Sequence, residues 1–383
     1  MRFLSLKTKK NRIMSMLLAA IFAASVLTAC GLSPASASPA GVPARAPGSW
    51  PQRPINMIVG YSAGGTTDII ARVLASAFEE YLGVPVTVVN ITGATAALGG
   101  SATLEAPADG YTIAASPIHA PSVWAVSEFN RHFTTDFYYF QVGTGDYFIV
   151  VEKDHRWQTI EDLVDEIKEN PGNFRYSHAG VGSLTHLAGE LFIKALDLEG
   201  LQGIPYAGGR EAGVRAMSGD VDFSYNTYSD IADLVLSGEL RVLGMMTAHP
   251  VVIETETPYE APSIPTIYPV LSATAELNSR WGLMIPRNTP SEIVKEIYNA
   301  FQWAMAQERF VDLITARVVD INIVVGHESD VNCLRIESLM AWGLYDTGLA
   351  SKSPEEFDIP RIDDFQMPPH DRAENMQPWP DGI

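Results

Sequence analysis

Short apolar runs alternate with helical patterns along most of the chain. Residues 55–61 form a mostly apolar run, and apolar positions over 67–81 then recur at helical spacing until Gly83 and Pro85 end the pattern. Two further strands are predicted over 86–89 and 111–115, separated by a small-residue turn and a short helix. Strands that alternate with helices predict a parallel sheet, so we expect an α/β fold.

A second series of the same kind begins at Tyr147. Strands are predicted over 147–151, 174–177, 203–206, 219–226 and 240–246, and helices over 159–169 and 184–196. Two helices over 291–306 and 329–345, with a strand over 318–325, should complete the first sheet. We therefore predict lobe one from residues 50–125 plus 247–350 and lobe two from residues 126–246. The segment 351–383 is acidic and Pro-rich, which predicts an extended or disordered tail.

The N-terminal segment predicts an exported lipoprotein. Four basic residues between positions 7 and 12 precede an apolar run over 14–29, which is shorter than the ~20 residues that span a bilayer. We therefore assign residues 1–29 to a signal peptide. The run ends in LTAC at 27–30, which resembles the lipobox of bacterial lipoproteins and implies acylation of Cys30; the alternative is an ordinary secretory signal with a chance cysteine. Residues 30–49, rich in Ala, Ser, Pro and Gly, predict a flexible tether.

The balance of charge restricts the partners. Acidic residues outnumber basic ones by 45 to 26, which gives a formal net charge of -19. Such a surface repels phosphate, so we expect no nucleic-acid partner. It also repels a free anion, and an anion site must therefore be built from local dipoles. The second cysteine, Cys333, has no intramolecular disulfide partner if Cys30 is acylated.

Four glycine-rich or small-residue turns, near 62–66, 90–100, 179–183 and 207–209, each follow a predicted strand and lead into a helix. A turn of this kind directs unpaired backbone N–H groups and the positive end of a helix dipole at the space above the sheet. One such turn is weak evidence, because glycine punctuates every α/β protein. Four of them, two in each predicted lobe, indicate an anion site between the lobes.

These turns and their neighbours resemble the solute-binding proteins of tripartite tricarboxylate transporters, also called the Bug family. The resemblance covers about residues 50–350 and rests on the order of the motifs rather than on any one of them. The motifs are YSAGGTTD at 61–68 with AR at 71–72, Asn90 with Gly93, Ala94 and Gly99, APADGYT at 106–112, SHAGVGS at 177–183 with His186, PYAGG at 205–209, GDVD at 219–222 and PT at 265–266.

The resemblance implies a type II-like periplasmic-binding fold, or Venus flytrap, whose two lobes hold the ligand's carboxylates, partly through water. By matching position, it implies these ligand contacts: Tyr61, Ser62, Gly64, Gly65, Thr66, Thr95, Gly180, Gly182, Ser183, Tyr206, Ala207, Gly208 and Gly209, with His186 as a further candidate. Ala63 and Ala207 depart from the family, which often has proline and lysine there. The missing lysine puts a transfer of substrate identity in doubt.

The function implied is capture of a di- or tricarboxylate, or an aromatic acid, for a permease with large and small membrane subunits. We expect a monomer that catalyses nothing, carries no cofactor or metal, and meets the membrane only through its lipid anchor, facing the periplasm or cell exterior. A solute sensor for a signalling receptor is one alternative. Another is a serine hydrolase that uses Ser62, because residues 60–64 read G-x-S-x-G between a strand and a helix. Only one strand precedes Ser62 after the tether, which disfavours the hydrolase.

Three further features are interpreted structurally. Asp68 should brace or cap the first helix. His119 and His178 show no metal-ligand spacing with Asp, Glu or Cys. The aromatic residues between 124 and 140 favour core or hinge packing over a ligand-facing wall.

Overall fold

The fold is known from a computed structural model. It describes residues 46, 48–124, 126, 134–317, 319–350, 352–365 and 378–383. The predicted signal peptide, Cys30 and almost all of the predicted tether lie outside the described residues. Within the part of the chain that is described, no helix is long and apolar enough to cross a lipid bilayer.

Lobe I is built on a six-stranded mixed sheet. Its strands are β1 (Ile55–Val59), β2 (Val86–Asn90), β3 (Thr112–Pro117), β4 (Phe137–Gly145), β12 (Ser279–Pro286) and β13 (Asp320–Val324). They lie in the order β13-β4-β12-β3-β1-β2. β1 is parallel to both of its neighbours, whereas β12 and β13 are antiparallel to the strands they pair with. The parallel half therefore carries the predicted strand-turn-helix units.

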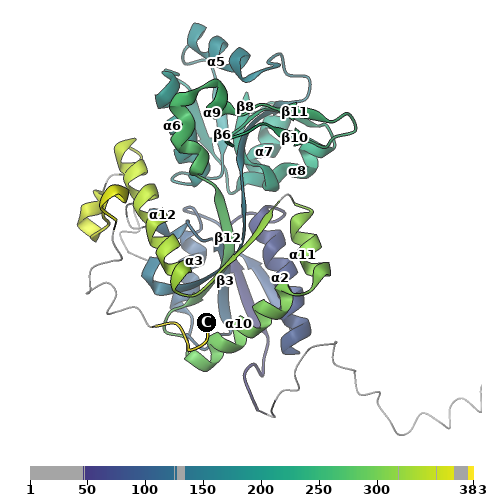
Figure 1. The fold of residues 1–383 in the computed structure, drawn as a ribbon, viewed down its shortest axis with the longest axis vertical. Coiled ribbons are helices and arrows are strands. Elements are labelled where there is room, and N and C mark those ends of the chain that lie inside the picture. The colour runs from purple at the N-terminus through teal and green to yellow at the C-terminus, as the bar shows by residue number, and fades with distance from the viewer. Residues whose placement is uncertain are drawn as a thin grey trace, which may run out of the picture. The chain divides into compact units, whose positions relative to one another are not determined.

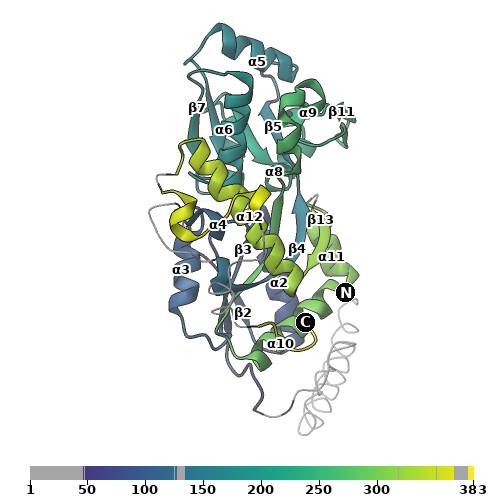
Figure 2. The same ribbon diagram turned by 60° about the vertical axis from the view of Figure 1, so that its left-hand side comes forward.

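Helices cover both faces of this sheet (Figures 1 and 2). On one side α2 (Thr66–Leu82) packs against α10 (Ser291–Met305) and α11 (Glu308–Thr315). On the other side α12 (His327–Asp346) packs against α4 (Pro121–Trp124), which in turn contacts α3 (Ala97–Glu105). Gly83 caps the C-terminus of α2 in the left-handed conformation, with φ of 72°. The helix therefore ends where the sequence predicts.

Lobe II is built on a five-stranded sheet in the order β7-β6-β8-β5-β9. The strands are β5 (Tyr147–Glu152), β6 (Arg175–His178), β7 (Gln202–Pro205), β8 (Phe223–Thr227) and β9 (Leu240–Met245). The helices are α5 (Ile160–Glu169), α6 (Leu184–Leu196), α7 (Gly209–Met217), α8 (Tyr228–Leu236) and α9 (Ile264–Ile267), and β10 (Val251–Ile253) with β11 (Tyr259–Ala261) adds a hairpin. β6 is parallel to β7 and β8, and β5 is antiparallel to its neighbours.

Two crossings join the lobes. β4 ends at Gly145 and β5 begins at Tyr147, so a single residue, Asp146, separates the strand of one sheet from the strand of the other. The chain returns between the 3₁₀ helix η2 (Pro269–Glu276) and β12. The hydroxyls of Tyr147 and Ser279 lie 2.6 Å apart and connect the two crossings. Such paired strands form a hinge about which two lobes can rotate.

The crossings differ from the predicted boundaries at residues 126 and 246. The sequence predicts core or hinge packing for the aromatic residues of β4 and no strand there, because the residues of β4 are almost all buried and lack the alternation that marks a half-buried strand. It pairs with β12 and β13 and belongs to lobe I. The segment after β9 stays with lobe II, because Met245 bridges Ser263 and β11 packs beside β9. The described aromatic residues of β4 are core residues.

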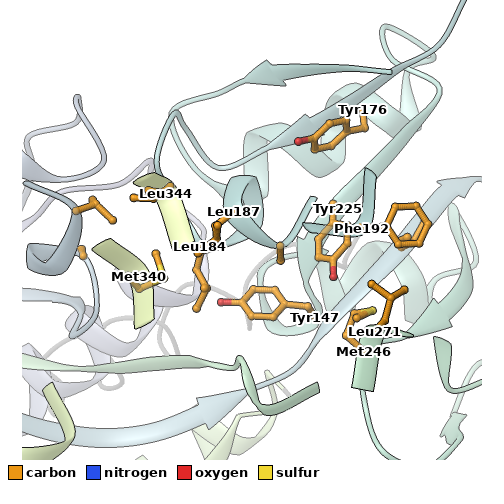
Figure 3. Packing of buried hydrophobic residues seen from close by; sticks show 14 of the residues in the cluster. Tyr147, Tyr176, Leu184, Leu187, Phe192, Tyr225, Met246, Leu271, Met340 and Leu344 are labelled. Atoms are coloured by element: carbon orange, nitrogen blue, oxygen red, sulfur yellow. The ribbon is translucent and has the colours of Figure 1, made fainter. Parts of the chain in front are cut away.

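A buried cluster spans both lobes beside the hinge. Figure 3 shows Leu184 and Leu187 of α6 near Met340 and Leu344 of α12. The approach of the two helices is close, since a Cβ added at Gly343 would lie 3.0 Å from Leu187 Cδ2. Lobe II is therefore packed against the C-terminal helix of lobe I in this conformation.

The segment after α12 packs back onto lobe I, which differs from the predicted extended or disordered tail. It contains two 3₁₀ helices, η3 (Pro354–Phe357) and η4 (Ile362–Asp364). Between them, the Ile359 carbonyl accepts a hydrogen bond of 3.0 Å from Trp342 Nε1 of α12. The Arg361 guanidinium lies 3.7 Å from the Trp342 ring centroid. The acidic, Pro-rich composition does not reveal this hydrogen bond or this cation–π contact.

Residues 378–383 pack on lobe I as well, while residues 366–377 lie outside the described residues. The Trp379 ring lies 4.9 Å from that of Tyr138 and 5.6 Å from that of Phe140, both on β4. Its Nε1 donates a hydrogen bond of 2.8 Å to Asp330 Oδ2 of α12. Lys295 Nζ of α10 donates to the Asp381 carbonyl at 2.7 Å.

Candidate ligand-binding site

Each of the four predicted turns joins a strand to a helix and faces the space between the lobes. The β1–α2 and β2–α3 turns belong to lobe I, and the β6–α6 and β7–α7 turns belong to lobe II. An inner cavity is lined by Tyr61, Ser62, Gly65, Thr67, Pro117, His119, Tyr147, Ala179, Ser183, Leu184, Thr185, Gly208, Gly209, Thr227, Asp230, Ser279 and Trp281. An adjoining outer cavity is lined by Gly60, Tyr61, Gly93, Ala94, Thr95, Ala96, Ala179, Gly180, Val181, Pro205, Tyr206, Ala207 and Glu211.

The sizes of the two cavities differ greatly. The inner cavity has a volume of about 40 Å³, which is room for a few water molecules. The outer cavity has a volume of about 500 Å³, within the range of small-molecule sites. A small organic acid can enter the inner cavity only if the lobes part.

Hydrogen bonds between the lobes hold the inner cavity closed. The Thr66 backbone N–H donates to Asp230 Oδ1 at 2.7 Å, and the Thr66 hydroxyl lies 3.0 Å from that of Ser229. The Ser62 N–H donates to the Ala207 carbonyl at 3.2 Å. The backbone N–H groups of Ser62 and Thr66 thus donate to groups of lobe II, whereas the sequence predicts that these two residues contact a ligand.

Gly64, also predicted to contact the ligand, is engaged within lobe I. Its N–H donates to Asp68 Oδ2 at 2.9 Å. Asp68 is buried and also accepts hydrogen bonds from Arg72 and Asn90, which hold the pKa of its carboxyl below the usual value against the effect of burial. Asp68 therefore braces the start of α2, which confirms the structural interpretation of this residue.

The β2–α3 turn is strained. Ala94, Thr95 and Ala96 have φ angles of 47°, 52° and 68°, a region that non-glycine residues rarely adopt. Trp124 Nε1 donates to the Thr95 carbonyl at 2.9 Å and holds the turn in place. The Thr95 hydroxyl donates to the Val181 carbonyl across the cleft. Strain of this kind is found at functional sites. Thr95 lines the outer cavity, and its contact with a ligand stays a prediction.

His186 braces the β6–α6 turn instead of lining either cavity. Its Nδ1 accepts a hydrogen bond of 3.1 Å from the Gly182 N–H. Two residues that are predicted to contact the ligand are therefore bonded to each other. Ser183 caps α6 by accepting from the His186 N–H at 3.2 Å. The His186 ring stacks on that of His178 with centroids 4.0 Å apart. Burial lowers the pKa of His178 to about 3 and that of His186 to about 4, so both rings are neutral at pH 7.

This pair predicts a loss of stability in mild acid. The unfolded chain takes up a proton near the ordinary histidine pKa of 6.5, whereas folded His178 stays neutral until about pH 3. The stabilising contribution is therefore complete above pH 6.5 and falls as the pH drops, by about 1 kcal/mol for His178 between pH 7.5 and 5.5. Glu190, 3.8 Å from His186 Nε2, opposes this trend, because burial raises its pKa.

Urea unfolding of His178→Asn at both pH values tests this expectation. The asparagine amide can still donate to the Gly180 carbonyl, which lies 3.0 Å from His178 Nδ1. The variant should lose less stability on acidification than the wild type, and exposed His249→Asn should match the wild type. Equal pH dependence in all three proteins would contradict the assignment.

Two buried polar atoms in the inner cavity have no hydrogen-bond partner among the described residues. They are Ser62 Oγ, in the β1–α2 turn, and His119 Nδ1, two residues beyond β3. Burial and the nearby charge of Arg280 lower the pKa of His119 to about 3, so its ring is neutral. Unsatisfied buried polar groups are rare, and a bound solute or water would satisfy both atoms.

Sequence reasoning missed part of the inner cavity. For His119 the sequence indicates only that metal-ligand spacing is absent, although this residue follows a strand next to β1, where the carboxyl ends of parallel strands meet. Tyr147 and Ser279 come from the hinge, and Trp281 from a strand that the pattern did not reveal. Asp230 lies in the first turn of α8 and belongs to none of the four predicted turns.

Two α/β lobes, joined by a two-strand hinge and facing each other through glycine turns, define the fold of a periplasmic solute-binding protein. The periplasmic binding protein BugD superposes with a TM-score of 0.70 at 22% identity, over 79% of this chain and 99% of BugD. An R. palustris protein solved with adipate superposes with a TM-score of 0.69 at 22% identity, over 79% and 99% of the two chains.

The sequence comparisons give the family. The model of the tripartite tricarboxylate transporter family receptor matches residues 70–344, and the chain belongs to this family. A UPF0065 protein of Cupriavidus necator is 32% identical over 271 residues, which cover 70% of this chain and 79% of that protein. Membership of this family of periplasmic receptors implies export.

Proposed function

We propose that the protein captures a small organic carboxylate between its lobes and delivers it to the membrane subunits of a tripartite tricarboxylate-type transporter. The proposal rests on family membership and on one observation: the glycine turns of both lobes converge on a cavity that holds unpartnered Ser62 Oγ and His119 Nδ1. The adipate present in the R. palustris structure agrees with a carboxylate ligand.

Closure of two lobes supplies the affinity that one turn cannot. A micromolar ligand needs about 8 kcal/mol, while a helix terminus supplies at most ~2 and a charge-assisted hydrogen bond ~1.5 to 3. Several N–H donors from both lobes, with water expelled on closure, can reach that total. The closed form also gives the permease a distinct shape to recognise.

A thermal-shift screen tests carboxylate capture. The full-length protein is heated with dicarboxylates, tricarboxylates and aromatic acids in turn. One or a few acids should stabilise it by about 2.7 kcal/mol at a concentration 100 times Kd, which raises Tm by several degrees. The absence of a response to every acid would count against the receptor.

The hydrolase alternative has little support. Among the described residues, no histidine nitrogen is hydrogen-bonded to Ser62 Oγ, and the family is one of binding proteins. A fluorophosphonate should therefore leave the protein unlabelled. Labelling of the wild type that disappears in Ser62→Ala would restore the hydrolase.

We also propose that the receptor acts as a monomer attached to the membrane through acylated Cys30. The LTAC sequence at 27–30 supports this anchor. Incorporation of a labelled fatty acid that is lost in Cys30→Ser checks it. Uptake of the captured acid that depends on both this protein and the permease would distinguish transport from a purely sensory role.

A further inference from the structure

The carboxylate of Asp230 lies at the meeting point of two glycine turns. Its Oδ1 accepts a hydrogen bond of 2.7 Å from the Thr66 N–H, at the first residue of α2. Its Oδ2 lies against Gly209, the first residue of α7, since a Cβ added there would be only 2.0 Å away. An internal carboxylate thus occupies the position where the dipoles of a lobe I helix and a lobe II helix favour an anion.

The side chain of Asp230 faces the inner cavity and is half-buried. Burial raises the pKa of its carboxyl above the usual value, and the hydrogen bonds from Thr66 and the charges of Arg210 and Arg317 offset part of this rise. The short N–H bond and the two helix termini all favour the ionised form. The effect reaches the neighbouring side chain, because the charge of Asp230 contributes to the raised pKa of Tyr61.

The described side chains that line the two cavities supply no positive charge. Neither Lys nor Arg lines the inner or the outer cavity among the residues that the structure describes. Each cavity instead carries one acidic side chain, Asp230 inside and Glu211 outside. His119 is neutral and adds no positive charge. A ligand with two carboxylates would bring two negative charges into walls that supply only dipoles to balance them.

We propose that Asp230 is a specificity-determining residue that selects a ligand with one carboxylate and, toward Asp230, a protonated amine. This inference rests on the proposed function of carboxylate capture and narrows its substrate class from di- and tricarboxylates to amino acids in the broad sense. The ligand's carboxylate uses the remaining turn amides and the Ser62 hydroxyl. Its ammonium group donates to Asp230, whose two carboxylate oxygens can accept more hydrogen bonds than Thr66 supplies.

Matched ligand pairs test the selection by charge at constant length. Succinate is compared with 4-aminobutyrate, and glutarate is compared with 5-aminopentanoate. The controls are butyrate and pentanoate, which carry only a carboxylate, and putrescine, which carries only amines. Calorimetry on the full-length protein should give an affinity at least about tenfold higher for the amino acid of a pair than for its diacid. Asp230→Asn keeps the shape and removes the charge, so this preference should disappear, mainly through a loss of at least about tenfold for the amino acid.

Asp233 provides the matched control. It lies one turn further along α8, pairs with Arg210 and Arg317, and lines neither cavity. Asp233→Asn removes the same charge and should keep the preference of the wild type. Melting curves of all variants, with Asp230→Ser as a second substitution, separate a selectivity change from a failure to fold.

The outcomes distinguish this inference from the function on which it rests. Tighter binding of the diacid in the pairs that bind, tightest binding of putrescine, or binding of simple monoacids alone would overturn the selection by charge. An amino-acid preference that survives in Asp230→Asn would overturn the role of Asp230. If no compound with a carboxylate binds, here or in the wider acid screen, the proposed function itself fails.

Discussion

Asp330→Ala should destabilise lobe I by about 3 to 5 kcal/mol, because it removes one partner of a buried ion pair. Arg287 and Asp330 are both 5% exposed. Two hydrogen bonds join them, from Nη1 to Oδ1 at 2.9 Å and from Nη2 to Oδ2 at 2.6 Å. Asp330 Oδ2 also accepts from Trp379, so the same change releases the packing of residues 378–383. Urea unfolding followed by tryptophan fluorescence measures the loss.

The pair between Arg361 and Asp346 serves as a control of similar geometry in solvent. Its closest contact is 2.8 Å, but the two side chains are 49% and 46% exposed. Water and salt screen such a pair, so Asp346→Ala should have a much smaller effect than Asp330→Ala. Similar losses in the two variants would contradict the importance given to burial.

Gly209→Ala should abolish tight ligand binding while the protein still folds. The added Cβ would lie 2.0 Å from Asp230 Oδ2 and 2.6 Å from Asn226 Oδ1. Asn226 cannot move away easily, because it donates to the Gly209 carbonyl at 2.8 Å and accepts from the Thr227 N–H at 2.8 Å. Asp230 must therefore leave its place, and the closed geometry of both turns is lost. We expect affinity for the best ligand to fall about a hundredfold or more, as when two charge-assisted bonds are broken.

Gly219→Ala is the matched control near the other end of α7. Its φ of 75° makes alanine unfavourable, but no atom lies within 4 Å of the added Cβ. This variant should lose some stability and keep its affinity. Calorimetry on both variants, with circular dichroism to verify folding, provides the comparison. Unchanged affinity in Gly209→Ala would show that the ligand does not use this turn.

The sequence was informative where local rules govern the structure. Strand, glycine turn and helix at 55–82 and at 174–196 follow from hydrophobic spacing and from the conformations that Gly83 and Ser183 favour. The turns and their order were also sufficient for the family, which the match over 70–344 confirms. Ser62, Gly65 and Gly209 were predicted as ligand contacts for the same reason and line the inner cavity. Their contact with a ligand stays a prediction.

The remaining features depend on contacts between distant segments. β4 shows no alternation because both of its faces are buried, so only its pairing with β12 and β13 identifies it as a strand. Asp230 is 164 positions from Thr66, the residue whose N–H it accepts, and no local pattern reveals that pair. Composition also concealed the packing of Trp379 on β4, since the aromatic partners lie far away in the sequence.

The packing of residues 378–383 has a practical consequence for spectroscopy. Asp381 is exposed, and its carbonyl is held by Lys295 of α10, so a fluorophore attached there would move with lobe I. Glu254 is exposed beside the β10–β11 hairpin and would carry a second dye with lobe II. Energy transfer between the two dyes would turn the hinge motion into an optical signal, without a probe in the cleft itself.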